Sequence, residues 1–311
     1  MIIPAAIAHG GADSDDAHWD GPQRAVDAAL NALERGEDVV DAAIAATKVL
    51  EDDPRFNAGT GSKIRLDGES IQLDASLMHS SGRFGAVAAL ERVKNPILVA
   101  REVFESPHLI VVGDGATRLA RRIGLAEHDV STDDARASVA EVREALLRGD
   151  GEWAAYDWRR AWNYDGSLEA AGLSRHTVGT DTVGCCVRDA HGNFAAALST
   201  GGTSTTLRGR VGDVPILGAG LYASPSAAVA CTGDGERILE ASLALRTHDR
   251  IVDGLNAQQA ADTAVDGLRT RGSIGILVLT SDAMAAACGS TMAWAGRNAG
   301  SAVWFGPASQ A

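Results

Sequence analysis

Two threonines enclose a short apolar segment, "TVGCCVRDAHGNFAAALST", which runs from Thr182 to Thr200. A turn centred on His191 would place Arg188 opposite Phe194, and the same register continued outward places Thr182 opposite Thr200. Directly opposed residues in an antiparallel pair have Cβ atoms about 4.5–5.5 Å apart. The segment therefore predicts a hairpin that brings two hydroxyl groups together at its open end. A threonine hydroxyl becomes a nucleophile when a base lies beside it; an ordinary cross-strand threonine pair is the alternative.

A cation, an anion and exposed backbone N–H groups follow this hairpin in the sequence. "GRVGD" contains Arg210 and Asp213, and "CTGDGE" contains Thr232, Gly233 and Gly235. Arginine binds a carboxylate with two parallel hydrogen bonds, a carboxylate binds an ammonium, and free N–H groups stabilise an oxyanion. Recognition and cleavage of an amino-acid derivative would require these groups. Taken alone, "GRVGD" also fits a surface ion pair in a loop.

The elements that must position these residues follow an α/β pattern. Apolar residues at helical spacing predict helices over 22–36, 38–52, 96–106, 235–248 and 256–272. Strands are predicted over 2–11, 84–93, 226–235 and 273–281, and a buried strand followed by a helix within 108–124. Alternation around Asp67-Gly68 predicts a further hairpin within 62–78.

The regular pattern stops between about residues 129 and 181. This stretch mixes charge and glycine with five aromatic residues, which are Trp153, Tyr156, Trp158, Trp162 and Tyr164. It is typical of a connector inside an otherwise compact α/β chain. The connector ends directly before Thr182, which draws attention to the bond between Asp181 and Thr182.

Composition and other motifs argue against several classes of function. The 311-residue chain has a formal net charge of −13, which disfavours nucleic-acid and anionic-membrane partners. Gly113-x-Gly115 lacks the third glycine of a dinucleotide fingerprint and fits a tight turn instead. The sequence has no G-x-S-x-G or H-E-x-x-H motif, and its four cysteines form no C-x-x-C pair. Without a membrane-length apolar run or a basic leader, we expect a cytoplasmic protein.

Motifs from both halves of the chain together resemble one family. "TVGCCVRDAHGNFAAALSTGGT", "GRVGDVPILGAG" and "CTGDGE" are similar to the signature of the plant-type asparaginases. Members of that family are isoaspartyl peptidases that also hydrolyse asparagine. "AHGG", "DDPRFNAGTGS", "LDASLM", "GAVAALERVKNP" and "HLIVVGDGA" match the same family in order. The resemblance covers nearly the whole chain, and these motifs are highly specific when taken together.

The resemblance implies an α/β (α+β) protein with the four-layer αββα sandwich of the Ntn-hydrolases. Residues 1–311 would form one domain, made as a precursor that cleaves itself before Thr182. The α subunit would span 1–181, including the connector from about 130 to 181, and the β subunit 182–311. Two cleaved chains would associate as (αβ)2. The expected substrates are L-asparagine and isoaspartyl dipeptides, hydrolysed to L-aspartate without a catalytic cofactor.

The same resemblance implies a role for each motif residue. Thr182 would be the nucleophile, assisted by Thr200, while Arg210 binds the substrate α-carboxylate and Asp213 its α-amino group. The oxyanion hole would consist of Thr232 and the Gly233 N–H, with Gly235 nearby, and Asn57 would support the site. A structural sodium or potassium ion would be held by backbone carbonyls in the 50–60 loop, those of Leu50, Glu51, Asp53, Phe56, Ala58 and Thr60.

Self-cleavage would supply the base that the motif lacks. An α-amino group has a pKa of about 7.7–8.0, so an N-terminal threonine can deprotonate its own hydroxyl near neutral pH. Thr177-Val178-Gly179 repeats the T-V-G pattern, but only Thr182 lies opposite Thr200. Arg55 stands where the family usually has an apolar residue. The aromatic connector also differs from the mostly polar linkers of the family, which leaves open whether it is shed after cleavage.

Two alternative functions remain at this point. One is a glycosylasparaginase-like amidase of the same superfamily, which "TGDG" favours but "KNP" and "SPH" disfavour. The other is an uncleaved, non-catalytic relative that binds amino acids.

Overall fold

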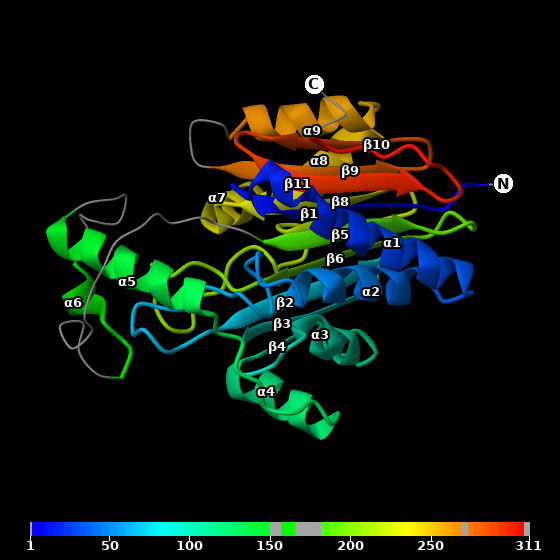
Figure 1. The fold of residues 1–311 in the computed structure, drawn as a ribbon. Helices are drawn as coiled ribbons and strands as arrows, with labels where there is room; N and C mark the ends of the chain where they lie inside the picture. Colours follow the sequence, from blue (N-terminus) through cyan, green and yellow to red (C-terminus); the bar gives the residue numbers. More distant parts are fainter. Residues whose placement is uncertain (1, 150–156, 166–181, 269–272, 308–311) are drawn as a thin grey trace.

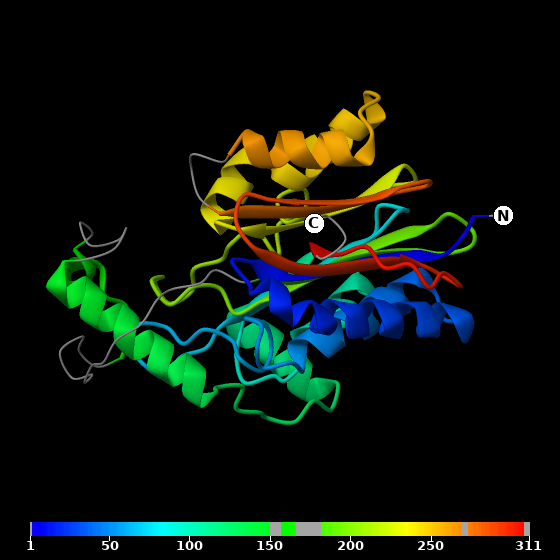
Figure 2. The same ribbon diagram turned by 45° about the horizontal axis from the view of Figure 1, so that its top comes forward.

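The computed structural model describes residues 2–149, 157–165, 182–268 and 273–307. Two β-sheets lie face to face between layers of helices (Figure 1; Figure 2). The larger sheet has the strand order β11-β1-β5-β6-β2-β3-β4. Its strands are β1 (Ala5–Ala12), β2 (Leu73–His79), β3 (Phe84–Leu90), β4 (Ile110–Val112), β5 (Val183–Arg188), β6 (Phe194–Thr200) and β11 (Met292–Asn298).

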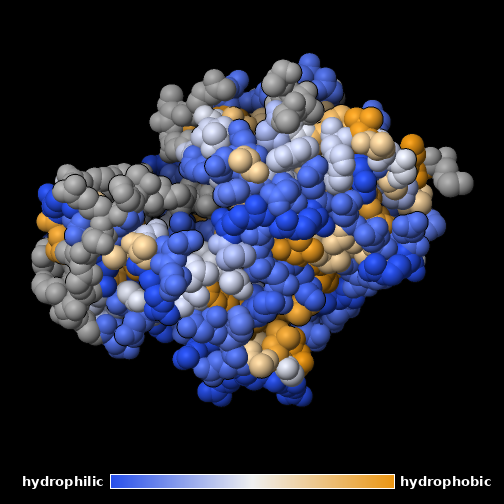
Figure 3. Space-filling view, viewed as in Figure 1, coloured by the Kyte–Doolittle hydropathy of each residue, from blue (hydrophilic) through white to orange (hydrophobic). Residues whose placement is uncertain are grey.

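The smaller sheet has the order β10-β9-β8-β7 and is antiparallel throughout. Its strands are β7 (Leu221–Ala223), β8 (Ala227–Gly233), β9 (Ile274–Thr280) and β10 (Met284–Cys288). Strands β5 and β6 of the larger sheet and strand β8 of the smaller sheet bring their motif residues together at one edge of the structure. The face seen in Figure 3 is mainly hydrophilic, in keeping with the net charge of −13.

Helices cover the outer face of each sheet (Figure 2). The larger sheet carries α1 (Asp20–Glu34), which follows the short 3-10 helix η1 (Asp16–Trp19), and α2 (Val39–Glu51), α3 (Pro96–Phe104) and α4 (Gly113–Arg122). The smaller sheet carries α8 (Leu243–Val252) and α9 (Ala257–Asp266), with α7 (Gly235–Ala241) directly after β8. Local sequence sets these boundaries: the Asp38 carboxylate caps α2, and Asn256 with Gln259 forms a capping box on α9.

Three apolar cores fill the three interfaces between these layers. Val26, Leu50 and Ile97 belong to the core between the first helical layer and the larger sheet. Ile7, Ala196, Leu198, Ala230 and Leu277 belong to the core between the two sheets. The third core, between the smaller sheet and its helices, includes Val229, Leu243 and Ile276. The predicted four-layer αββα sandwich is therefore confirmed.

The β5–β6 hairpin has the register predicted from its sequence. Arg188 pairs with Phe194 at the turn, and Val183 pairs with Ser199 at the open end. The Asp189 carboxylate accepts hydrogen bonds from the backbone N–H groups of His191 and Asn193, which fixes the tight turn. The hairpin lies in the middle of the larger sheet, between β1 and β2; Thr200 pairs with Asp74 of β2, and Gly184 pairs with His9 of β1.

Two predicted elements of the first half are wrong. The turn at Asp67-Gly68 exists, with Gly68 at φ 82°, but residues 62–66 form no strand in the described structure. Strand β2 already pairs with β3 and β6, so no free edge remains for a hairpin partner. The strand within 108–124 was predicted to be buried; β4 is a three-residue edge strand, parallel to β3, on which Ile110 and Val112 are exposed.

The predicted connector is only partly irregular. It contains α5 (Asp133–Arg148), which begins at the side-chain cap Thr132, and the short α6 (Trp158–Ala161). Figure 1 shows both helices as an arm beside the two-sheet body. Trp153, Tyr156, Thr177 and Asp181 lie outside the described residues. Within the part that is described, no helix has the length and apolar character needed to span a membrane.

Candidate active site

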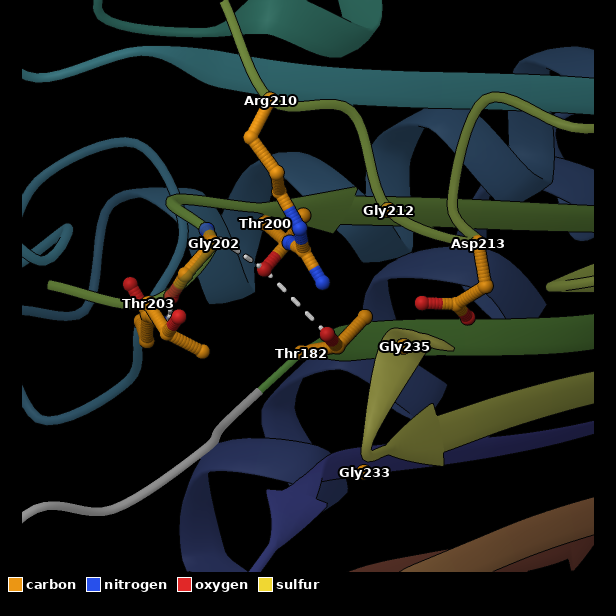
Figure 4. A pocket seen from close by; sticks show the side chains of 10 residues that line it. Thr182, Thr200, Gly202, Thr203, Arg210, Gly212, Asp213, Gly233 and Gly235 are labelled. Atoms are coloured by element: carbon orange, nitrogen blue, oxygen red, sulfur yellow. Dashed lines mark hydrogen bonds between the residues drawn. The ribbon is translucent and has the colours of Figure 1, made fainter. Parts of the chain in front are cut away.

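A small pocket lies at the start of β5 and the ends of β6 and β8, beside the loop that follows β6 (Figure 4). Thr182 directly precedes β5, Thr200 ends β6 and Gly233 ends β8. Residues from more than 140 positions apart meet here, because the sheet order brings the two halves of the chain together. The lining comprises Asn57, Thr182, Thr200, Gly202, Thr203, Arg210, Gly212, Asp213, Gly233 and Gly235.

The two predicted hydroxyls are in direct contact. Thr182 Oγ1 donates to Thr200 Oγ1 at 3.2 Å, and both residues are buried. Thr200 Oγ1 also accepts the Gly202 N–H at 3.0 Å (Figure 4). A hydroxyl that receives an N–H bond is fixed in position, so Thr200 can orient the Thr182 oxygen. No histidine lines the pocket among the described residues, so the nucleophile must obtain its base elsewhere.

Thr232 lies beneath Thr182 and links the two sheets. Its Oγ1 accepts the backbone N–H of Thr182 at 3.3 Å and that of Ala12 at 3.1 Å, and donates to the Thr182 carbonyl at 3.3 Å. The following residue, Gly233, has φ 126°, and a Cβ there would overlap the Ser273 carbonyl. Glycine at this position therefore lets β8 turn sharply beside the nucleophile.

Arg210 is oriented by a carboxylate that the sequence analysis did not single out. Glu236, in the first turn of α7, accepts hydrogen bonds from Arg210 Nε at 2.8 Å and from Nη2. This bidentate pair occupies one edge of the guanidinium. Within the described residues Nη1 has no hydrogen-bond partner, and the Arg210 side chain points into the pocket (Figure 4). The signal in the sequence that could have identified Glu236 is its position directly after the last glycine of "CTGDGE".

Asp213 lines the pocket and approaches Gly235 on the same side as Arg210. It is 4 % exposed, and its Oδ2 has no hydrogen-bond partner. Burial raises the pKa of this carboxyl to about 7, against the opposing effect of the Arg210 charge. A Cβ on Gly235 would lie 2.8 Å from both Arg210 Nη2 and Asp213 Oδ1. Glycine thus leaves a space between a cation and an anion, which suits the α-carbon of an amino acid.

Comparison with known proteins agrees with this geometry. Residues 4–304 match a family described as asparaginase. The chain belongs to the asparaginase family. A plant-type L-asparaginase of Pyrococcus abyssi is 39% identical over 84% of each chain. A probable isoaspartyl peptidase/L-asparaginase 2 of Arabidopsis thaliana is 34% identical over 83% of this chain and 81% of its own length. An isoaspartyl peptidase/L-asparaginase of Danio rerio is 33% identical over 96% and 94%.

Two side chains hold the loop that carries Gly202. Asn57 Nδ2 donates to the Gly202 carbonyl at 2.7 Å, while Asn57 Oδ1 accepts the Lys63 N–H at 2.9 Å. Arg65, 1 % exposed, donates to the carbonyls of Gly201 and Thr203 at 2.6 and 2.9 Å. Through its two hydrogen bonds Asn57 would support the site, as the family resemblance implies. Arg65 was missed, because its sequence neighbours indicate only an alternating strand.

His9 was also missed as a neighbour of the nucleophile segment. It lies on β1 opposite Gly184, and its imidazole is fully buried. A Cβ on Gly184 would lie only 2.7 Å from His9 Nε2, so the glycine of the T-V-G motif makes room for this ring. Burial lowers the pKa of His9 to about 3, which keeps the imidazole neutral at physiological pH.

The 50–60 loop is tightly wound around two glycines with positive φ. A Cβ on Gly59 would lie 2.6 Å from both the Glu51 and Lys94 carbonyl oxygens, and one on Gly61 would overlap the Pro54 carbonyl and lie 2.8 Å from that of Phe56. Several carbonyl oxygens therefore converge on a loop that only glycine can close. Arg55, the predicted departure from the family, points outward to ion pairs with Asp20 and Asp53.

Proposed function

We propose that the protein is an N-terminal-threonine amidohydrolase that cleaves its own chain between Asp181 and Thr182. The mature enzyme would hydrolyse L-asparagine and isoaspartyl dipeptides and release L-aspartate. The observation that carries this proposal is the Thr182–Thr200 hydroxyl pair in one pocket with Arg210 and Asp213, which both approach Gly235. The names of the relatives, plant-type L-asparaginase and isoaspartyl peptidase/L-asparaginase, support the same substrate class.

Self-cleavage is the first step of the proposed mechanism. The Thr182 Oγ1 attacks the Asp181 carbonyl carbon, the amide nitrogen leaves with a proton, and an ester links the two residues. This shift frees the Thr182 α-amine. Water then hydrolyses the ester, which releases the Asp181 carboxylate and restores the Thr182 hydroxyl. Thr232 Oγ1 already accepts a hydrogen bond from the Thr182 nitrogen, so the same contact can hold the new amine beside the Thr182 hydroxyl.

Substrate hydrolysis then uses the amine as the base. Arg210 and Asp213 bind the α-carboxylate and α-ammonium, which leaves the side-chain carbonyl of asparagine toward Thr182. The α-amine takes the hydroxyl proton as Oγ1 attacks, and the Thr232 hydroxyl with the Gly233 N–H stabilises the oxyanion. The proton passes to the departing amine, leaving an acyl-enzyme that water converts to aspartate. The leaving group lies beyond the carbonyl, so ammonia or an amino acid can depart.

Intact mass and N-terminal sequencing of purified protein test this proposal directly. We expect two copurifying fragments, of which the smaller begins Thr-Val-Gly-Cys-Cys, and release of ammonia from asparagine. A full-length mass after long incubation, without hydrolysis, would favour an amino-acid-binding relative instead. Turnover of a glycan-linked asparagine in preference to free asparagine would favour the glycosylasparaginase alternative.

We also propose that the 50–60 loop binds a sodium or potassium ion through the backbone carbonyls of Leu50, Glu51, Asp53, Phe56, Ala58 and Thr60. The convergence of oxygens around Gly59 and Gly61 supports this proposal, because hard cations take oxygen ligands. The ion would stabilise the loop that presents Asn57. Melting temperature measured in sodium, potassium and choline chloride at equal ionic strength tests it. Identical values in all three salts would contradict it.

The remaining expectations concern assembly and location. We propose that two cleaved chains associate as (αβ)2, which size-exclusion chromatography with light scattering would test. We also propose a reducing, cytoplasmic location. Its support is that all four cysteines, Cys185, Cys186, Cys231 and Cys288, carry free thiols.

A further inference from the structure

The connector segment 157–165 packs against the loop that carries Arg210. Tyr164 is 7 % exposed and forms a small apolar cluster with Leu66 and Val142, separate from the three main cores. Trp162 and Leu207 pack against this cluster, and the Trp162 and Tyr164 rings lie 4.9 Å apart. The cluster therefore joins α5, the connector and the substrate loop through apolar contacts.

The same segment forms hydrogen bonds with the backbone of the loop that carries Arg210. Asn163 Nδ2 donates to the Arg208 carbonyl at 2.8 Å, and Asn163 Oδ1 accepts the Arg208 N–H at 3.0 Å. Tyr164 OH donates to the Thr206 carbonyl. One side-chain amide thus satisfies both backbone groups of Arg208, as a neighbouring strand would.

Residues 201–213 need such support because they form no helix or strand in the described structure. The Arg210 N–H is bonded to the Leu207 carbonyl at 3.0 Å, so the backbone at Leu207 and Arg208 sets where the Arg210 side chain starts. The Arg208 guanidinium reaches Ser70 Oγ at 2.6 Å and Glu91 at 2.7 Å, which anchors the same point to the protein body.

We propose that the connector segment 157–165 remains docked after cleavage and positions Arg210, thereby setting the affinity of the pocket for an α-carboxylate. This inference rests on the proposed function only for its kinetic consequence. Asn163 and Tyr164 are positioning residues, since they touch the loop and not the substrate. The segment ends 16 residues before the proposed scissile bond, so cleavage there does not itself remove any of these contacts.

Hydrogen exchange tests the docking without reference to catalysis. We expect the Arg208 amide of the cleaved enzyme to be protected, and to exchange at least about tenfold faster in Asn163→Ala. The matched control is Asn31→Ala, an exposed asparagine on α1, which should leave this amide unchanged. Equal exchange in the parent and Asn163→Ala would overturn the docking, whether or not the protein hydrolyses asparagine.

Steady-state kinetics test the effect on substrate binding. For asparagine, Asn163→Ala and Tyr164→Phe should each raise KM about three- to tenfold, as expected for the loss of supporting hydrogen bonds, with kcat within about twofold. Tyr222→Phe, which removes a hydroxyl on β7, is the control for Tyr164→Phe. For the α-amide of asparagine the increase in KM should disappear. An unchanged KM for asparagine, or an equal increase for both substrates, would overturn the positioning role; an inactive parent protein would instead contradict the proposed function.

Discussion

Arg210→Lys separates recognition of the substrate from the chemistry of Thr182. In the structure Nε and Nη2 of Arg210 bind Glu236, and the side chain points into the pocket (Figure 4). A lysine has one nitrogen, so it cannot hold Glu236 and a substrate carboxylate in the same fixed geometry. Hydrogen bonds to charged groups contribute about 1.5–3 kcal/mol each, so loss of one lowers kcat/KM by one to two orders of magnitude. We therefore expect a decrease of about 10- to 100-fold for asparagine.

The assay is ammonia release from asparagine and from its α-amide, measured with each variant. Arg237→Lys is the matched control, because Arg237 lies on α7 and pairs with Glu240 at the surface, at 3.0 Å. It should leave kcat/KM within about twofold, as is usual for an exposed ion pair. Self-cleavage of Arg210→Lys should proceed, since the chain's own peptide bond needs no carboxylate anchor. Equal loss of activity on asparagine and on the α-amide would refute the assignment of Arg210.

Three further outcomes are expected of the pocket. Gly235→Ala should lower kcat/KM more than about tenfold with little change in melting temperature, because its Cβ would fill the space 2.8 Å from Arg210 Nη2 and Asp213 Oδ1; near-parent kinetics would contradict this. Only ionised Asp213 can pair with an ammonium, and burial raises its pKa to about 7, so kcat/KM for asparagine should rise with pH through about 7. In Asp213→Asn this limb should be missing, and only the limb of the Thr182 α-amine, with its ordinary pKa of about 7.7–8.0, should remain. An unchanged profile would assign the titration near 7 to another group. Thr182→Ala should lose both self-cleavage and hydrolysis, and Thr200→Ala should fold but lose much of its activity; ammonia release by Thr182→Ala at the parent rate would identify another nucleophile.

Local sequence was sufficient for the parts of the site that depend on short-range geometry. The turn between Asp189 and Asn193 determines the hairpin register, and the register alone places Thr182 beside Thr200. The glycines around Thr232 and Asp213 also indicated where the backbone lines the pocket. The layers of the fold followed from the family resemblance, and the three apolar cores confirm them.

The contacts that were missed come from pairings across long stretches of chain. His9 meets Gly184 only because β1 lies beside β5, and Arg65 reaches Gly201 only because its loop folds over the end of β6. Neither residue has a local pattern that distinguishes it. Helix α5 did have a local signal, which was the Thr132 cap followed by apolar residues at helical spacing. The helix was not predicted because the whole connector was interpreted as irregular from its aromatic residues farther along the chain.

Because of the Thr232 contact, the spacing between the two sheets determines the position of Thr182 relative to Thr232. Thr182 directly precedes β5 of the larger sheet and Thr232 lies in the smaller sheet, so the distance between the proposed nucleophile and the proposed oxyanion donor depends on the distance between the sheets. That distance is set by side chains such as Ala196 and Ala230, which lie in the core between the sheets and not in the pocket. A larger side chain at either position would separate the layers and misalign the two threonines. Substitutions in the core between the sheets can therefore change the geometry of the pocket without lining it.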